Sequence, residues 1–146
     1  MHYSIFGKAT AVIVTVAVAL APTLAWSADA VKLPASAKQL AKDEIIALYS
    51  GKSTTWDHPN TDKSTGTTII AADATSMSGT WVNGKDKGEW EGKISFNKKD
   101  QYCYVTRGKG DKKYGKETCN LVFVDGKTVY EINPKSKKVL SINTIQ

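Results

Sequence analysis

The sequence predicts a mainly β protein: a small antiparallel barrel or sandwich meander of about eight strands, with one N-terminal helix and one disulfide. Helical spacing of apolar side chains is convincing only in residues 36–50. The rest of the chain after Gly51 is rich in threonine, aromatic residues and Gly/Asn/Asp turns, which is typical of short strands joined by tight connections. Both cysteines, Cys103 and Cys119, lie in this β region.

The N-terminus has the features of a signal peptide. Lys8 precedes an apolar stretch, Ala9 to Leu20, and small residues suit cleavage after about position 27 or 30. The stretch is shorter than a membrane-spanning helix requires. We therefore expect residues 1–30 to be removed and residues 31–146 to form a single β-rich domain. Its location would be periplasmic or secreted, with no membrane span after cleavage.

The helix is expected over residues 36–50, SAKQLAKDEIIALYS. Ser36 can cap its start, with Gln39 completing a capping box, and Gly51 is placed to end it. The apolar residues that recur at helical spacing are Leu40 or Ala41, Ile45, Leu48 and Tyr49. This apolar face should pack against the β region.

Strands are expected over Ser53–Trp56 and Thr67–Ala71, with a polar loop at residues 57–66. Two hairpins follow, with type I′ turn signals at Asn83-Gly84 and Asp125-Gly126. Pairing outward from the first turn puts Trp81 opposite Asp86. The pattern after that turn alternates, with Trp90, Gly92, Ile94 and Phe96 on one face. A final strand is expected over Val139–Ile145.

Cys103 and Cys119 most simply form one disulfide across two neighbouring strands, residues 101–107 and 117–124. We expect their shared face, which also carries Val105, Leu121 and Phe123, to be the core face. The opposite face is also apolar, and its residues are Tyr102, Tyr104, Val122, Val124 and Val129. Either the helix covers that face, through Ile45, Leu48 and Tyr49, or it is an exposed patch available for binding.

No catalytic or metal site is expected. His58 is the one histidine outside the signal peptide, and it lies beside Asp57 in a polar loop without a predicted partner to orient it. Glu89 and Glu91 point the same way from one strand, which is typical of a solvated strand face rather than of a glycosidase pair. Zinc requires three or four closely spaced ligands, which the sequence lacks.

Aromatic residues are the candidate ligand contacts. Trp56, Trp81 and Trp90 could line a barrel cavity; the alternative, which we favour, is that they fill the interior. Tyr102 and Tyr104 join them as candidates. The lysines at 109, 112, 113 and 116 indicate a solvated hairpin tip, which we favour, or an anion-binding site.

The net charge is +6, and Arg107 is the only arginine among 20 basic residues. Phosphate recognition favours arginine, and nucleic acid is an improbable partner for an exported chain. A weak affinity for anionic surfaces, such as lipopolysaccharide or membrane headgroups, is consistent with this charge.

Four motifs follow one another along the chain: DEIIALYSGKSTTW, GEW, QYCYV and ETC. In this order they resemble a bacterial exported family known as domain of unknown function 995, and the resemblance covers about residues 40–132. Members are similar in a helix ending in "LYSG" or "LYG", a following Thr/Trp strand, a later G-x-W strand and a paired cysteine hairpin. The resemblance implies a periplasmic or secreted β-rich domain with no established activity.

We therefore expect a non-catalytic binding or accessory protein without a cofactor, whose candidate partners are a small apolar ligand or an envelope protein. The alternative is an envelope-associated protein-interaction or inhibitor-like module that acts through its loops. A cavity lined by the tryptophans would favour a small ligand. A filled interior with an exposed Tyr102/Tyr104 patch would favour a protein partner.

Overall fold

The structure is a computed structural model that describes residues 30–146. The elements, in chain order, are β1 (Lys38–Gln39), α1 (Lys42–Tyr49), β2 (Ser53–Asp57), β3 (Thr65–Ile70), β4 (Ser76–Asn83), β5 (Asp86–Phe96), β6 (Tyr102–Gly108), β7 (Thr118–Asp125), β8 (Thr128–Ile132) and β9 (Val139–Ile145). All but the last residue of the predicted signal peptide lies outside the described residues. Within residues 30–146, no helix has the length and apolar character that crossing a membrane requires.

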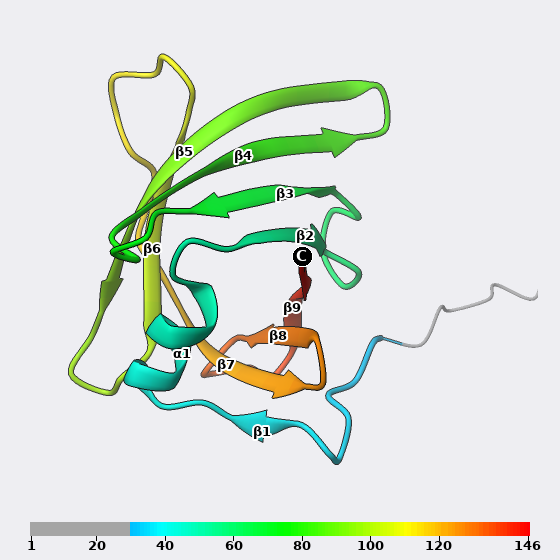
Figure 1. Ribbon diagram of the computed structural model, residues 1–146. Helices are drawn as coiled ribbons and strands as arrows, with labels where there is room; N and C mark the ends of the chain where they lie inside the picture. Colours follow the sequence, from blue (N-terminus) through cyan, green and yellow to red (C-terminus); the bar gives the residue numbers. More distant parts are fainter. Residues whose placement is uncertain (1–29) are drawn as a thin grey trace, which may run out of the picture.

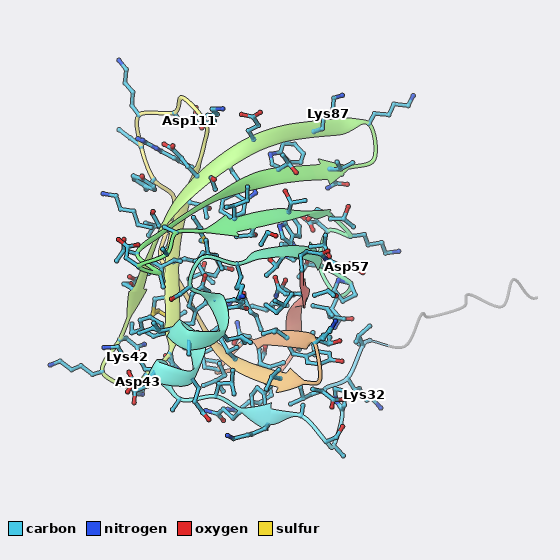
Figure 2. The ribbon with its side chains drawn as sticks, viewed as in Figure 1. Lys32, Lys42, Asp43, Asp57, Lys87 and Asp111 are labelled. Carbon is cyan, nitrogen blue, oxygen red and sulfur yellow. A yellow bond between two sulfur atoms is a disulfide. The ribbon has the colours of Figure 1, made fainter. Side chains whose placement is uncertain are left out.

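Strands β2 to β9 form a closed antiparallel barrel in which each strand pairs with the next along the chain (Figure 1). Closure comes from the pairing of β2 with β9, in which Thr54 lies opposite Ile145 and Asp57 opposite Ile142. Charged side chains such as Lys42 and Lys87 extend away from the barrel (Figure 2). The predicted eight-stranded antiparallel meander is confirmed, and it takes the barrel form rather than the sandwich form.

The helix is shorter than predicted and is not the N-terminal element. It covers only Lys42–Tyr49, and the short strand β1 precedes it and pairs with β7. Ser36 does not cap it, because the Ser36 hydroxyl donates to Asp125 Oδ2 at 3.0 Å. Instead Ala41 is the N-cap residue, and its N–H donates to Glu44 Oε2 at 2.9 Å. Extended pairing with β7 has thus displaced the predicted first turns of the helix.

Helix α1 packs into the barrel core through two side chains. Ile45 is 1% exposed and Tyr49 is 2% exposed. The Tyr49 ring centroid lies 5.5 Å from that of Tyr102, and both residues belong to one core cluster with Val122 and Val129. The first alternative for the tyrosine face is therefore correct: the helix covers it.

The predicted core face of the cysteine hairpin is wrong. The disulfide itself is confirmed: Cys103 and Cys119 are bonded and lie directly opposite each other, with their Cα atoms 4.0 Å apart. However, Tyr102 and Val122 on the other face point into the core, so the face with the disulfide forms the outer wall. Both faces of β7 are apolar, so alternation alone could not distinguish inside from outside.

Both hairpin turns are shifted by one position from the prediction. Asn83 pairs with Asp86, and Asp125 pairs with Thr128, so the two turn residues begin at Gly84 and at Gly126. These glycines have φ of 61° and 60°, and a glycine with positive φ at the first turn position is the signature of type II′. The shift moves each partner by two residues, so every side chain keeps its face.

Candidate functional site

The barrel contains a cavity of about 400 Å³ that is partly open to solvent. All five residues predicted as candidate ligand contacts line it: Trp56, Trp81, Trp90, Tyr102 and Tyr104. The expectation that the tryptophans fill the barrel interior is therefore wrong, because space remains between them and the facing strands. The structure brings together in one place residues that are spread over β2, β4, β5 and β6.

Each tryptophan lies against a glycine directly opposite on the neighbouring strand. The pairs are Trp56 with Gly66, Trp81 with Gly88, and Trp90 with Gly79. A Cβ atom at Gly88 would lie 2.7 Å from Trp81 Nε1, and one at Gly79 would lie 2.9 Å from Trp90 Cζ2. The missing side chains let the indole rings lie close to the barrel wall. This arrangement helps to keep the centre of the barrel open.

The cavity has two chemically different walls. One comes from β2, β3, β8 and β9. It contains Trp56 and Ile70, and its polar residues are Thr54, Thr68, Glu131, Ser141 and Asn143. The other comes from α1 and from β4, β5 and β6. Asn83 and Thr106 are polar residues on it, and its aromatic and other apolar residues are Tyr49, Met77, Trp81, Trp90, Tyr102 and Tyr104. A ligand that fits both walls would have an apolar face and a polar edge.

Glu131 is a buried carboxyl group on the polar wall, with 7% of the residue exposed. Asn120 Nδ2 donates a hydrogen bond to Glu131 Oε2 at 2.8 Å. Burial disfavours the charged form and raises the pKa of Glu131 to about 7, although the Asn120 hydrogen bond opposes this shift. The carboxyl group can therefore gain or lose its proton near neutral pH.

Two polar atoms near this carboxyl group have no hydrogen-bond partner among residues 30–146. They are Tyr49 Oη and Asn120 Oδ1, both fully buried. A buried polar atom without a hydrogen-bond partner lowers stability by about 1–3 kcal/mol. Such atoms therefore suggest that a bound ligand supplies the partner. Tyr49 lines the cavity, which gives a ligand direct access to it. Burial, followed by the negative charge of Glu131, raises the pKa of Tyr49 well above the usual range, so its hydroxyl remains neutral.

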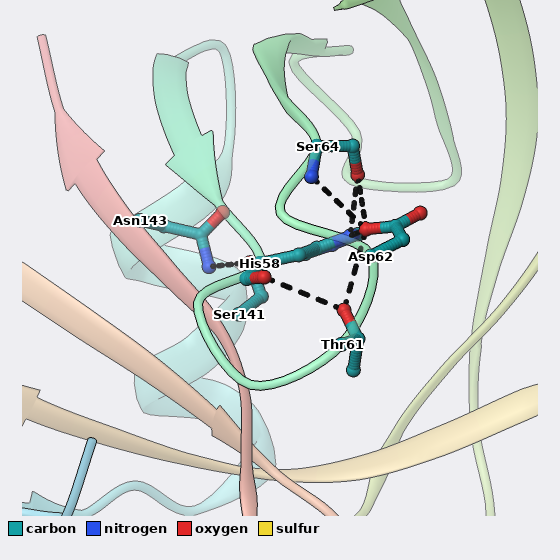
Figure 3. Close-up of polar contacts among 6 residues, drawn as sticks. All are labelled: His58, Thr61, Asp62, Ser64, Ser141 and Asn143. Atoms are coloured by element: carbon teal, nitrogen blue, oxygen red, sulfur yellow. Dashed lines mark hydrogen bonds and ion pairs between the residues drawn. The ribbon is translucent and has the colours of Figure 1, made fainter. Parts of the chain in front are cut away.

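The loop between β2 and β3 places a histidine, an aspartate and a serine together beside the cavity (Figure 3). Ser64 Oγ lies 3.1 Å from His58 Nδ1 and donates to Asp62 Oδ1 at 2.6 Å. Asp62 Oδ1 also lies 3.5 Å from the same Nδ1 atom of His58. Asp57, the neighbour predicted from the sequence, is instead exposed in β2.

This cluster differs from a catalytic triad in its connectivity. A triad places the nucleophile and the acid at opposite nitrogens of the imidazole ring, whereas here both contact Nδ1. The Ser64 hydroxyl and backbone N–H both donate to Asp62, and these bonds lower the pKa of Asp62 to about 2. The His58 ring stacks on Trp56, with centroids 4.5 Å apart. The contacts hold the loop in place at the cavity wall.

The paired carboxylates, Glu89 and Glu91, lie on the outer wall in ion pairs with the next strand and its loop. Glu91 pairs with Arg107, whose guanidinium carbon lies 4.5 Å from the centroid of the Tyr114 ring. Glu89 pairs with Lys109. The other lysines of the hairpin tip, Lys112, Lys113 and Lys116, are exposed. Cys103, Cys119 and Glu117 lie within ligating distance of one another, but the disulfide occupies both sulfur atoms.

Sequence reasoning missed the polar part of the cavity, above all Glu131, and the Asn120 side chain that donates to it. Glu131 lies between Tyr130 and Ile132 in the segment TVYEI. A single glutamate in such a strand predicts a side chain that faces solvent. Burial of a carboxyl group has no local sequence signal, because it depends on which strand faces it. Asp62 and Ser64 have a weak signal, since aspartate often accepts a hydrogen bond from the N–H two residues later.

Comparison with curated proteins and with solved structures finds no significant match to this chain. A family model described as Protein of unknown function (DUF995) does match, over residues 16–138. The matched region includes α1 and β2 to β8 and ends just before β9, so it contributes nearly all of the cavity lining. Since the match spans most of the sequence, the chain belongs to the DUF995 family of proteins of unknown function.

Proposed function

We propose that this protein is an exported, non-catalytic binding protein that holds one small ligand inside its barrel. The observation that carries the proposal is the cavity, together with the buried hydroxyl of Tyr49 that lines it without a partner. A volume of about 400 Å³ falls within the roughly 300–1,000 Å³ of small-molecule pockets. An eight-stranded barrel is the size at which the interior can hold one small ligand.

The chemistry of the two walls supports a ligand that is apolar with a polar group. Aromatic side chains bury a large apolar area, and Trp81, Trp90 and Tyr104 offer it on one side. Thr54 and Ser141 offer hydroxyl groups on the other. Export is supported by the N-terminal sequence and by the disulfide, because disulfides persist in oxidising compartments.

The alternative of an interaction module acting through its loops has less support. It required Tyr102 and Tyr104 to form an exposed patch, but Tyr102 is 3% exposed and both line the cavity. Catalysis also has less support, because the hydrogen bond that the Ser64 hydroxyl donates goes to Asp62 Oδ1, whereas a nucleophile would donate it to the histidine. The binding role is therefore the function that the geometry favours.

Native mass spectrometry of the protein purified from its own periplasm tests the proposal. The expected result is a bound species of small mass that leaves on denaturation. Thr54→Phe should abolish it, because Thr54 is 2% exposed and points into the cavity. Thr55→Phe is the matched control, since Thr55 is exposed on the outside of the same strand. Near-ultraviolet circular dichroism checks that both variants fold.

Two results would contradict the binding role. One is wild-type protein that carries no small molecule after gentle purification. The other is a folded Thr54→Phe variant that carries the same amount of ligand as Thr55→Phe, because that ligand would then lie outside the barrel.

A further inference from the structure

The inference concerns the charge of the ligand, and it rests on the proposed function. Glu131 lies on the inner side of β8, lines the cavity and is buried. Among residues 30–146, no lysine, arginine or histidine nitrogen lies within 4.0 Å of its carboxylate. Its hydrogen bond comes from the neutral amide of Asn120. The cavity therefore contains an acidic group whose charge the surrounding protein does not balance.

Within residues 30–146, the titratable groups whose pKa the charge of Glu131 affects are tyrosines. They are Tyr49 from α1, and Tyr102 and Tyr104 from β6. Burial, and then the charge of Glu131, raises the pKa of each of them above the usual range, so all three remain neutral hydroxyls. The remaining titratable residues of the cavity lining have other partners: His58 lies against Asp62, and Arg107 pairs with Glu91. The pKa of Glu131 itself is raised to about 7 by burial. A cation placed beside it would reverse that shift and stabilise the carboxylate.

The tyrosines also supply the aromatic faces that organic cations prefer. The ring centroid of Tyr102 lies 5.5 Å from that of Tyr49 and 5.7 Å from that of Tyr104. Ammonium groups bind over aromatic rings through the negative charge on the ring faces. The unpartnered Tyr49 Oη, which lines the cavity, is a further acceptor for an N–H donor. A carboxylate, aromatic rings and an unpartnered acceptor together match the needs of an ammonium group.

We propose that the cavity takes a small aromatic or apolar amine, whose ammonium group pairs with the carboxylate of Glu131 and whose apolar part packs against Trp81 and Trp90. A carboxylic acid of the same size would place a second negative charge against Glu131. A neutral alcohol would gain the aromatic contacts but not the ion pair. The proposal therefore gives a ranking of three ligands that share one ring system.

The experiment uses naphthylmethylamine, naphthalenemethanol and naphthoic acid, titrated into the processed protein by calorimetry at about pH 8. The amine should bind about 10–100-fold more tightly than the alcohol, which is the range for a hydrogen bond to a charged group. The acid should bind more weakly than the alcohol. Glu131→Gln should remove the advantage of the amine over the alcohol. Glu89→Gln, which removes an outer-wall charge, is the control.

A pH series on the wild-type protein gives a second readout that does not depend on the variant folding. As Glu131 gains its proton, the amine loses the ion pair, so its affinity should fall about 10–50-fold between about pH 8 and pH 5. The affinity of the alcohol should not change.

The outcomes separate the inference from the proposed function. If the alcohol binds as tightly as the amine, or if the amine binds equally at both pH values, the ammonium pairing is wrong while the binding role stands. If none of the three probes binds, the amine proposal is wrong, while the binding role is decided separately by the mass spectrometry of wild type and Thr54→Phe.

Discussion

Glu131→Gln should stabilise the ligand-free protein above neutral pH. The pKa of Glu131 is raised from 4.5 to about 7 in the folded state, a difference of about 2.5 pKa units. At about 1.36 kcal/mol per unit, the ionised side chain destabilises the fold by about 3 kcal/mol. This full value applies because the side chain is buried. A neutral glutamine can keep the hydrogen bond from Asn120 and avoids the cost of burying a charge.

The sign of the pH dependence follows from the direction of the shift. The folded state holds the Glu131 proton more tightly than the unfolded state. Below about pH 4.5 the side chain is protonated in both states and does not lower the free energy of unfolding. Its destabilising effect grows as the pH rises and is complete above about pH 7. The free energies of unfolding of wild type and Glu131→Gln should therefore agree at low pH and differ by about 3 kcal/mol at about pH 8.

Urea unfolding followed by tryptophan fluorescence measures this difference. Both proteins are unfolded at several pH values across that range, and subtracting the two curves cancels all other titrating groups. Glu89→Gln controls for the loss of one negative charge, because its side chain is on the outer wall and 57% exposed. A constant difference between wild type and Glu131→Gln across the range would refute the reasoning. It would mean that water reaches the carboxyl group in the folded state.

Three further changes test the wall and the core. Replacing Cys103 and Cys119 by serine removes the cross-link of a loop of about 15 residues and should lower the free energy of unfolding by about 3 kcal/mol in urea. Gly79→Ala should destabilise the fold by up to about 3 kcal/mol, because the added Cβ would meet backbone atoms of the neighbouring strand. Gly88→Ala should destabilise it less, because the added Cβ would meet only a side chain. Thermal unfolding measures both effects. Tyr49→Phe should raise the free energy of unfolding by about 1 kcal/mol, measured as a higher urea midpoint, because it removes a buried hydroxyl without a partner.

Each of these changes has an outcome that contradicts it. A double serine variant as stable as wild type would mean that the hairpin needs no cross-link. Equal effects at Gly79 and Gly88 would mean that the neighbouring strand moves as easily as the indole of Trp81. A less stable Tyr49→Phe variant would mean that the hydroxyl has a partner in solution.

The strands and the disulfide could be predicted because their signals are local. Alternation in β5 placed Trp90 and Phe96 on one face, and the structure agrees. The two turn glycines identified the hairpins, although Gly84 and Gly126 occupy the first turn position rather than the second. The disulfide could be predicted because the chain has only two cysteines. Each of these predictions depends on residues that are close together in the sequence.

The inside and outside of the barrel were harder to predict, because they depend on distant partners. Leu121 and Val122 are both apolar, and only the closure of the barrel decides that Val122 points inward. The same closure buries Glu131 and brings it near Tyr49 from the helix. The tryptophans could be named in advance as candidate contacts. Whether they would fill the lumen or line it depended on the glycines across from them.

Strand β1 also affects how the protein behaves among other copies of itself. Strand β6 pairs with β7 only from Asn120 towards the hairpin tip, so the far half of β7 needs another neighbour on that side. Lys38 and Gln39 provide it, and the N–H of Leu40 donates to the carbonyl of Val122 at 2.9 Å. An unpaired strand edge recruits strands from other molecules. A chain trimmed beyond Gln39 would expose this edge and would tend to self-associate through β7.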